Sequence, residues 1–363
     1  MLIKTLQLTS FRNYKKESFL FDPFINILIG DNAQGKTNVL EAIYLLSSGR
    51  SFKGPSENMI YFDDEFSIVE GEAVSNAMPL HLKIVLSSQG KKAILNNKDI
   101  KRLSEYIGYL NVILFQPEDL LLIKGNPSKR RKLIDRELSK ISPIYMYNIT
   151  KYNKLLKERN VYLKTLKSKH KKADLYLEVL SEQMAELQVD LIQRRIAFVE
   201  LLHSFSSTLY QYIANDELLM IGYETQYKKI DKDTILARYK DHYDRDIRYG
   251  KTQDGLQRDD LKITLNKKDA TQFASQGQQR AIVLSIKMAL LEIVKKQVGE
   301  YPILLLDDVL SELDDTRKTK LLNLIDGKVQ TFVTTTSIEG LHHSLIEKAK
   351  KIEIVNGSIK EES

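Results

Sequence analysis

The sequence predicts an α/β protein in which a mostly helical block interrupts the chain. Short apolar runs typical of strands alternate with amphipathic helical patterns in the first part of the chain and again after about residue 275. Between these parts, residues 127–215 place apolar residues at three- and four-residue spacing among many charges, which is typical of helices. Because the α/β pattern returns after the block, the two α/β segments are expected to meet in space.

The composition is that of a globular chain with an excess of positive charge. The 363 residues are 42% hydrophobic and 28% charged, enough for a large core and two or three subdomains. The net charge of +7 favours polyanionic partners, although a basic surface without such a partner is equally compatible with it. The absence of cysteine excludes disulfides, thiol catalysis and cysteine-ligated zinc.

No segment predicts membrane insertion or export. No apolar run is long enough to cross a bilayer. Residues 1–16 alternate polar and apolar side chains and lack the apolar centre of a signal peptide. We therefore expect a cytoplasmic protein with no membrane partner.

The N-terminal segment is predicted to consist of strands and one helix. Residues 37–48 are expected to form the helix, because their apolar side chains recur on one face. The later strands are short and expected to be antiparallel, with a turn at Asn96 and Asn97. The predicted strand segments span residues 2–8, 24–30, 66–74, 80–87, 91–100 and 110–116.

The rest of the chain predicts a helical hairpin followed by a second α/β segment. The polar stretch at residues 167–174 separates two amphipathic helices. Residues 216–265 are mixed and predict no clear pattern. A helix is expected to begin near Ser275, followed by a buried strand ending near Asp308 and another strand within residues 328–337.

Residues 30–37 match the pattern G-x-x-x-x-G-K-[ST] between an apolar strand and an amphipathic helix. Gly30 and Gly35 permit the backbone angles and close approach that a phosphate-binding loop needs. Lys36 would reach the β and γ phosphates, and Thr37 would offer its hydroxyl to Mg²⁺. We therefore expect ATP and Mg²⁺ as cofactors. The predicted ATP-binding residues are Gly30, Asp31, Asn32, Ala33, Gln34, Gly35, Lys36, Thr37 and Asn38.

A second nucleotide motif is predicted near the C-terminus. The apolar run at residues 303–306 ends in Asp307 and Asp308, as expected of a Walker B strand. Asp307 would hold Mg²⁺ with Thr37, and Asp308 would polarise the attacking water. The alternative is an ordinary buried strand with an acidic turn, but the two nucleotide motifs each predict the other.

Three further short segments resemble motifs of ABC-type ATPases. Residues 275–280 (SQGQQR) resemble the signature motif, and residues 311–314 (SELD) resemble the D-loop. Gln116 stands where the Q-loop glutamine would be, which implies a role in Mg²⁺ binding and catalysis. Each short match is weak, whereas five motifs in the same order are strong. The residues concerned are Gln116 for the Q-loop, Ser275, Gln276, Gly277 and Gln278 for the signature, and Ser311 and Asp314 for the D-loop.

Within that superfamily the whole chain resembles the RecF family of SMC-like ATPases. The resemblance implies an α/β fold: an ABC-type P-loop ATPase lobe with an antiparallel β subdomain, plus an inserted mostly α-helical lobe. The ATPase lobe would comprise residues 1–125 and 255–363, and the helical lobe II residues 126–254. The segments that carry the resemblance are FRNY (11–14), GDNAQGKTN (30–38), FQPEDL (115–120), KGNPSKRRKLID (124–135), SQGQQR (275–280) and LLLDDVLSELDD (304–315).

The resemblance also implies an ATP-dependent homodimer. Ser275 and Gly277 of one subunit would meet the γ-phosphate held by Lys36 of the other, since a helix N-terminus with small residues is a second anion site. Arg12 would lie near the adenine or the phosphates. The implied function is ATP-dependent binding of double-stranded DNA beside single-stranded gaps, in repair and replication. Slow hydrolysis would release the dimer, and RecR and RecO would be partners in loading recombinase.

Several residues depart from the patterns of these families. Gln276 replaces the first glycine of the usual ABC signature, as in other RecF-like sequences. Asp308 stands where most ABC ATPases have glutamate, which implies slow hydrolysis. The strand that often ends in a switch histidine ends here in residues 334–337, TTTS. Leu256 and Gln257 replace proline and histidine in a segment that RecF proteins usually write as G-P-H-R-D-D.

Two basic clusters are candidates for contacts with DNA phosphates. Both are also compatible with a solvated charged face. Nothing in the sequence resembles a recognition helix, so binding should read backbone and structure rather than base edges. The first cluster comprises Lys129, Arg130, Arg131 and Lys132, and the second Lys164, Lys167, Lys169, Lys171 and Lys172.

Other classes of protein are less compatible with the sequence. A small-molecule kinase would have no use for the signature segment or for the late Walker B strand. An SMC-like structural DNA-tethering ATPase would need long arms, and the helical insert is too short for them. The chain also lacks a carboxylate-rich nuclease domain, and its large helical block has no counterpart in transporter ATPases.

Overall fold

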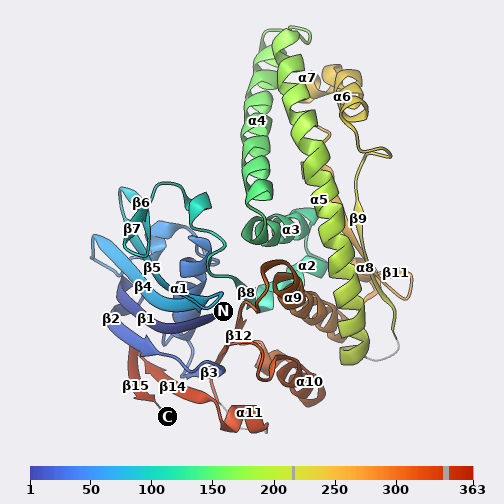
Figure 1. Ribbon diagram of the computed structural model, residues 1–363. Helices are drawn as coiled ribbons and strands as arrows, with labels where there is room; N and C mark the ends of the chain where they lie inside the picture. The colour runs from blue at the N-terminus through green and yellow to red at the C-terminus, as the bar shows by residue number, and fades with distance from the viewer. Residues whose placement is uncertain (215–216, 338–342, 363) are drawn as a thin grey trace. The chain divides into compact units, whose positions relative to one another are not determined.

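The computed structural model describes residues 1–214, 217–337 and 343–362, which form two compact units (Figure 1). Unit 1 consists of Met1–Leu120, Leu209–Asn215 and Arg280–Ser363, and unit 2 of Leu121–Thr208 and Asp216–Gln279. Residues 215 and 363, which end predicted segments, lie outside the described residues. The chain therefore leaves unit 1 and returns to it.

The unit boundaries differ from the lobe boundaries expected after residues 125 and 254. Unit 2 extends to Gln279, because strand β10 (Asp260–Leu265) pairs with β9 (Leu219–Glu224) in an antiparallel register. The short β11 (Lys268–Asp269) completes this three-stranded sheet. Residues 255–279 thus pack with the helical unit.

A mixed sheet with parallel central strands organises unit 1. Its order is β15-β14-β3-β13-β12-β8, and β14, β3, β13, β12 and β8 run parallel. The carboxyl ends of parallel strands lie at one edge, so the segments that follow β3, β12 and β8 meet there. The strands are β3 (Ile25–Ile29), β8 (Val112–Phe115), β12 (Ile303–Asp307), β13 (Thr331–Thr335), β14 (Lys350–Val355) and β15 (Ser358–Glu362).

An antiparallel sheet forms the other layer of unit 1. Its order is β2-β1-β4-β5-β6-β7, and Asn96 and Asn97 form the β6–β7 turn with φ of 48° and 64°, as a tight hairpin requires. The strands are β1 (Leu2–Phe11), β2 (Tyr14–Leu20), β4 (Phe66–Ser75), β5 (Met78–Ser87), β6 (Gly90–Leu95) and β7 (Lys98–Ile100).

Helix α1 (Lys36–Ser48) lies between the two sheets of unit 1. It contacts β4 and β5 of the antiparallel sheet as well as β8, β12 and β13 of the other. Most of its residues are buried, including Val39, Leu40 and Leu46, which belong to one core cluster shared with both sheets. The helix that follows the P-loop is therefore held on two sides.

A helical hairpin is the main element of unit 2. Contacts between α4 (Pro143–Ser168) and α5 (Leu175–Ala214) join residues later in α4 to residues earlier in α5, so the helices run antiparallel (Figure 1). These contacts are Asn148–Asp190, Arg159–Ser181 and Glu158–Tyr176. The other unit 2 helices are α2 (Leu121–Lys124), α3 (Pro127–Ile141), α6 (Lys232–Asp241), α7 (Tyr243–Tyr249) and α8 (Ala270–Phe273).

The remaining helices begin with α9 (Gln276–Val298), which starts in unit 2 and continues into unit 1. Unit 1 also contains α10 (Asp315–Ile325) and α11 (Ser344–Glu347). No helix in the described ranges is long and apolar enough to cross a membrane. Short 3-10 turns span Ser56–Met59, Leu103–Glu105, Pro117–Leu120, Leu256–Arg258 and Leu310–Glu312.

Candidate nucleotide-binding site

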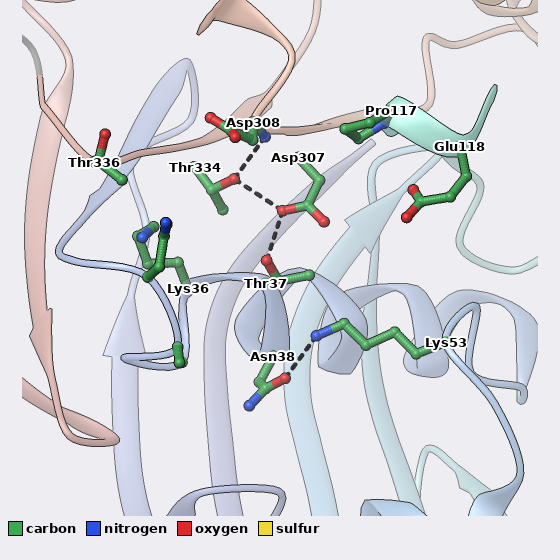
Figure 2. A pocket seen from close by; sticks show the side chains of 13 residues that line it. Lys36, Thr37, Asn38, Lys53, Pro117, Glu118, Asp307, Asp308, Thr334 and Thr336 are labelled. Carbon is green, nitrogen blue, oxygen red and sulfur yellow. Dashed lines mark hydrogen bonds between the residues drawn. The ribbon is translucent and has the colours of Figure 1, made fainter. Parts of the chain in front are cut away.

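A cavity of ≈ 260 Å³ opens at the carboxyl edge of the parallel strands in unit 1 (Figure 2). The segments that follow β3, β12 and β13, the loop after α1 and the turn after β8 all contribute to it. Segments far apart in the sequence thus converge, as the two nucleotide motifs predict. The lining residues are Asn32, Ala33, Gly35, Lys36, Thr37, Asn38, Lys53, Pro117, Glu118, Asp307, Asp308, Thr334 and Thr336.

The phosphate-binding loop needs glycine at two positions. Gly35 has φ of 121°, and a Cβ there would come within 2.8 Å of both the Asn13 amide nitrogen and the Tyr14 hydroxyl. A Cβ at Gly30 would lie 2.3 Å from the carbonyl oxygen of Ile354. The loop is therefore packed too closely against its supports to accept a side chain at either position.

Two turns support this loop from outside. The turn between β1 and β2 contributes Asn13, whose amide donates to Gln34 O (2.9 Å), and Tyr14, whose hydroxyl donates to Gly35 O (3.1 Å). The turn between β14 and β15 donates the backbone N–H of Gly357 to Gln34 O (3.0 Å). The FRNY segment thus has a structural role that its sequence did not reveal.

Lys36 points into the cavity and binds the loop's own backbone. Its Nζ donates to Gly30 O (2.5 Å) and Asp31 O (2.7 Å). Burial lowers the pKa of Lys36, while the nearby charges of Asp308, Asp31 and Asp307 act in the opposite direction. An ammonium group partly removed from water beside backbone amides is suited to binding phosphate.

Thr37 and Asp307 meet at the base of the cavity (Figure 2). The Thr37 hydroxyl donates to Asp307 Oδ1 (2.8 Å), and the Thr334 hydroxyl donates to the same oxygen (2.9 Å). Burial raises the pKa of Asp307, and these two hydrogen bonds oppose that shift. A hydroxyl and a carboxylate fit the oxygen ligands that Mg²⁺ prefers.

Asp308 adopts a left-handed backbone conformation with φ of 54°. Its N–H donates to Thr334 Oγ1 (2.9 Å), and the Ser311 hydroxyl donates to its carbonyl (2.7 Å) and to Oδ1 (2.9 Å). Ser311, predicted as a D-loop residue, therefore orients this carboxylate. Asp314, the other predicted D-loop residue, instead caps α10 by accepting from Arg317 N (2.9 Å).

Two residues that the sequence reasoning missed line the cavity beside the predicted ones. Glu118 lines the cavity, whereas the predicted Gln116 does not. The Gln116 N–H instead donates to Asp119 Oδ2 (2.9 Å). Lys53 donates to Asn38 Oδ1 (2.8 Å), and burial lowers its pKa against the opposing charge of Glu41. Lys53 lies in the loop after α1 and matches no motif, while Glu118 lies in the FQPEDL segment without having been singled out, so only the folded chain places both side chains here.

Some predicted nucleotide residues have other contacts in the structure. Arg12 forms a two-pronged ion pair with the buried Glu41 (2.9 and 2.6 Å) and donates to Asn58 O, and it does not line the cavity. Gly30, Asp31 and Gln34 belong to the loop without lining the cavity. Their roles stay predictions.

The signature segment forms a capping box at the start of α9. Ser275 Oγ accepts from the Gln278 N–H (3.3 Å), and Gln278 Oε1 accepts from the Ser275 N–H (2.8 Å). Gln278 also donates to Glu217 Oε1 (2.6 Å). Ser275 and Gln276 are exposed, Gly277 lies between Gln276 and Gln278 in the first turn, and none of these signature residues lines the cavity.

The first basic cluster is only partly available for DNA. Arg130 is buried and forms a two-pronged ion pair with Asp260 (2.7 Å to each oxygen), and it also donates to Leu122 O and Gly125 O. The expectation that Arg130 contacts phosphate is therefore corrected, since its donors hold the start of unit 2 together. Arg131 donates to Asp259 O (2.8 Å) and is partly buried, whereas Lys129 and Lys132 are exposed.

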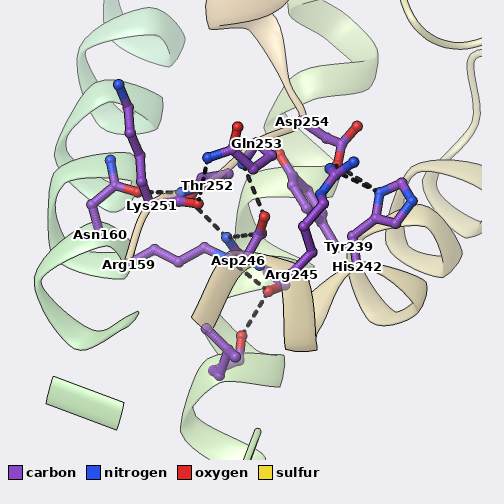
Figure 3. Close-up of polar contacts among 12 residues, drawn as sticks. Arg159, Asn160, Tyr239, His242, Arg245, Asp246, Lys251, Thr252, Gln253 and Asp254 are labelled. Atoms are coloured by element: carbon purple, nitrogen blue, oxygen red, sulfur yellow. Dashed lines mark hydrogen bonds and ion pairs between the residues drawn. The ribbon is translucent and has the colours of Figure 1, made fainter. Parts of the chain in front are cut away.

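The segment that departs from the RecF pattern lies in a polar network in unit 2. Gln257 accepts from the Tyr152 hydroxyl (3.0 Å) and donates to Asp254 O (2.7 Å). Just before it, Thr252 accepts from the buried Arg159 (2.7 Å). Asp254 contacts Arg238, His242 and Arg245, and Figure 3 labels the last two of these. Gln257, which replaces the usual histidine, thus provides hydrogen-bond partners for the Tyr152 hydroxyl and the Asp254 carbonyl.

The cavity, the two acidic residues at the end of β12 and the capped signature helix together define a P-loop ATPase of the ABC type. The family model of the RecF/RecN/SMC N terminal domain matches residues 2–361. The chain belongs to this family and, within it, to the RecF family.

The relatives cover the whole chain. It is 43% identical to the DNA replication and repair protein RecF of Oceanobacillus iheyensis over 368 aligned positions, covering 99% of this chain and 100% of the relative. It is 41% identical to the protein of the same name from Geobacillus sp. (strain WCH70), covering 99% and 98%.

Solved structures confirm the predicted fold class. The recombination mediator protein RecF bound to ATP superposes with a TM-score of 0.91 at 34% identity, covering 99% of this chain and 97% of that one. An Smc head bound to the C-winged helix domain of ScpA shares the fold alone, with a TM-score of 0.58 at 16% identity. The fold is thus an ABC-type ATPase fold shared with SMC heads.

Proposed function

We propose that this protein is an ATP-switched DNA-binding ATPase of gap repair and replication maintenance. The observation that carries the proposal is the convergence of Lys36, Thr37, Asp307 and Asp308 on one cavity. The relatives named as DNA replication and repair proteins, and the solved recombination mediator RecF with ATP, support the same function. ATP binding would drive dimerisation on DNA, and slow hydrolysis would release it.

In this proposal each cavity residue has a role in phosphoryl transfer. Lys36 binds the β and γ phosphates, and Thr37 with Asp307 holds Mg²⁺, with Gln116 as a further ligand. The ion, when bound, neutralises charge developing on the phosphate oxygens. Asp308 accepts a proton from the water that attacks the γ-phosphorus, and the bond to the leaving ADP oxygen breaks.

The dimer is proposed to close the site in trans. The capping box leaves the Ser275 hydroxyl hydrogen available, because its oxygen serves as the acceptor. An exposed helix start of this kind can donate to the γ-phosphate held by a second copy. Asp314 and Ser311 would lie near the same junction, with Arg12 near the adenine or phosphates.

The proposal extends to lobes, partners and location. Residues 1–125 with 255–363 would act as the ATPase lobe and residues 126–254 as lobe II, although residues 255–279 pack with unit 2. The DNA would be duplex beside single-stranded gaps, RecR and RecO would be the protein partners in loading recombinase, and the location would be the cytoplasm. DNA would weakly stimulate hydrolysis.

Fluorescence anisotropy of a gapped duplex tests the proposal. Binding is measured with and without ATP and Mg²⁺ across a salt series, with Lys36→Arg as the control. We expect ATP to strengthen binding by the parent alone and affinity to fall steeply with salt. In light scattering the control should stay monomeric with ATP. Binding that ignores ATP, or an unchanged dimer in the control, would refute the switch.

A further inference from the structure

The two helices of the unit 2 hairpin carry opposite charges. Helix α4 contains one acidic residue, Glu158, and lysines spread along its length. Residues 175–208 of α5 contain no lysine and five acidic residues. Helices that pack side by side therefore present different potentials to solvent. The acidic residues of this part of α5 are Glu178, Glu182, Glu186, Asp190 and Glu200.

The lysines of α4 share its solvent face. The buried residues of α4, such as Tyr152, Leu155 and Leu163, face the rest of unit 2. Steps of three and seven residues place the first four lysines within about 140° of arc on the opposite face. From Lys151 to Lys164 the helix rises about 20 Å, the length of about six base pairs of duplex. These exposed lysines are Lys151, Lys154, Lys157 and Lys164.

The row continues into the turn that joins α4 to α5. Lys167, Lys169, Lys171 and Lys172 are all exposed, and no acidic residue lies between Lys164 and Lys172. We call the eight residues the α4 lysine row: Lys151, Lys154, Lys157, Lys164, Lys167, Lys169, Lys171 and Lys172. Three of its members were not singled out by the sequence.

The α4 lysine row makes no ion pair with any carboxylate of the described residues. The acidic side chains closest in the chain are used elsewhere. Glu158 accepts from the Tyr176 hydroxyl (2.5 Å), and Asp174 accepts from the Tyr162 hydroxyl (2.5 Å) and from Leu177 N (3.2 Å). The lysines of the row thus have no close carboxylate partner, although the charge of Asp174 acts on Lys171 at the end of the row.

Cations facing α5 are, in contrast, neutralised. Lys232 of α6 pairs with Glu182 (2.7 Å), Lys240 of the same helix pairs with Glu178, and Arg194 pairs with Asp190 within α5. The side of the hairpin lined by α5 and α6 therefore has alternating, paired charges. Of the described sides of the hairpin, only the α4 side carries a row of lysines that form no ion pair, and Glu158 is the single acidic residue of α4 on that face.

We propose that the α4 lysine row is a docking surface for the phosphate backbone of duplex DNA, and that the α5 face is not. This inference rests on the proposed function, which names DNA as the ligand but does not say which surface binds it. Flexible ammonium groups spaced along about 20 Å match a polyanion without selecting a base sequence. Protein interfaces are depleted in lysine at their cores, so an acidic protein partner fits this row less well.

Neutralising four lysines tests the proposal. The variant Lys151→Gln, Lys154→Gln, Lys157→Gln and Lys164→Gln should bind duplex DNA at least about tenfold more weakly near 0.1 M salt. The slope of log affinity against log salt should become shallower by about 0.9 for each phosphate that the variant no longer neutralises. The matched control replaces the exposed Lys15, Lys16, Lys267 and Lys268 with glutamine, which changes the net charge equally.

The outcomes separate this inference from the proposed function. If the parent binds DNA and both variants bind it equally weakly, or neither is weakened, the α4 row is not the docking surface. If the parent itself does not bind DNA, the proposed function fails first. Weaker binding of an acidic protein partner, with DNA binding unchanged, would assign the row to that other class and overturn the proposal.

A second measurement does not depend on multiple substitutions. The chain has no cysteine, so Lys154→Cys and Glu186→Cys each introduce one reactive thiol, on α4 and α5 respectively. Maleimide labelling is then timed with and without a short duplex. We expect DNA to slow labelling at position 154 by several-fold and to leave position 186 unchanged. Equal protection at both positions, or none at position 154, would overturn the proposal.

Discussion

Asp308 is held in a backbone conformation that only a few residue types adopt readily. A left-handed residue that is not glycine costs about 1–3 kcal/mol, and it persists where its surroundings determine it. Here the Thr334 and Ser311 hydroxyls bind its N–H, carbonyl and carboxylate. The carboxylate is therefore positioned before any substrate arrives, as a general base requires.

Replacing Asp308 with Asn should separate binding from hydrolysis. Asn has the same shape and tolerates the left-handed conformation, but it cannot accept the proton of the attacking water. We expect ATP binding to persist, phosphate release to fall by about 10²–10⁴-fold, and ATP-bound dimers to accumulate in light scattering. Asp315→Asn on the exposed side of α10 is the control. If the Asp308→Asn variant hydrolyses ATP at the parent's rate, Asp308 is not the general base.

Arg159 and Asp246 form an ion pair that is fully buried, at 2.8 Å. Arg159 also donates to Thr252 (2.7 Å) and Ser181 (3.0 Å), so three separate elements depend on it (Figure 3). Removing one partner leaves the other charge buried without compensation. This arginine is therefore a structural centre of unit 2.

We expect Arg159→Met to lower the free energy of unfolding by about 3–5 kcal/mol, as measured by urea titration. The control is Arg194→Met, which removes an arginine from a partly exposed pair four residues apart on α5. That change should cost less than about 0.5 kcal/mol. Equal decreases in the two variants would contradict the importance assigned to the buried pair.

At the scale of elements, residues 252–260 connect the helices of unit 2. Asp254 contacts Arg238 and His242 (2.7 Å each) and also Arg245, all from α6, α7 and the residue between them. Burial acts to raise the pKa of Asp254, but hydrogen bonds from Arg238 and His242, with attraction to Arg238 and Arg245, hold it below its usual value. The ionised carboxylate thus favours the folded state.

This lowered pKa makes a pH-dependent contribution to stability. It is present above the pKa of the unfolded carboxyl, near about 4, and disappears as pH falls through the folded value. Asp254→Asn should therefore cost about 1–3 kcal/mol at about pH 7 in urea titration, and the difference from the parent should shrink below about pH 4. Asp233→Asn on the exposed side of α6 is the control. A difference that stays constant with pH would contradict this assignment.

At the scale of the whole molecule, the proposed dimer would depend on a helix start that lies in unit 2. We expect Ser275→Arg to bind ATP but to remain monomeric in light scattering, because a bulky side chain would block a second copy. Ser142→Arg is matched to it, since Ser142 caps α4 in the same way by accepting from Tyr145 N (3.2 Å). That control should dimerise with ATP. If the Ser275→Arg variant dimerises with ATP, Ser275 does not contact the γ-phosphate of a second copy.

The strands predicted from short apolar runs occur in the structure, and so does the helical hairpin with its break at residues 167–174. β2 was not predicted, because YKKESFL has few apolar side chains. Its strand conformation depends on pairing with β1. β14 and β15 were also not predicted, since their pairing partners lie more than 300 residues away or just beyond a turn. The mixed stretch 216–265 contains β9, α6 and α7, whose individual patterns are too short to stand out.

The sequence by itself determined the phosphate-binding loop, the acidic residues at the end of β12 and the helix start near Ser275. Each depends on a few adjacent residues whose backbone angles and donors are local properties. Only the tertiary structure decided that Lys53 and Glu118 line the cavity, that Arg130 is buried, and that α4 keeps its charge where α5 does not. These facts depend on which distant groups approach each side chain, and burial and pairing are properties of the folded chain.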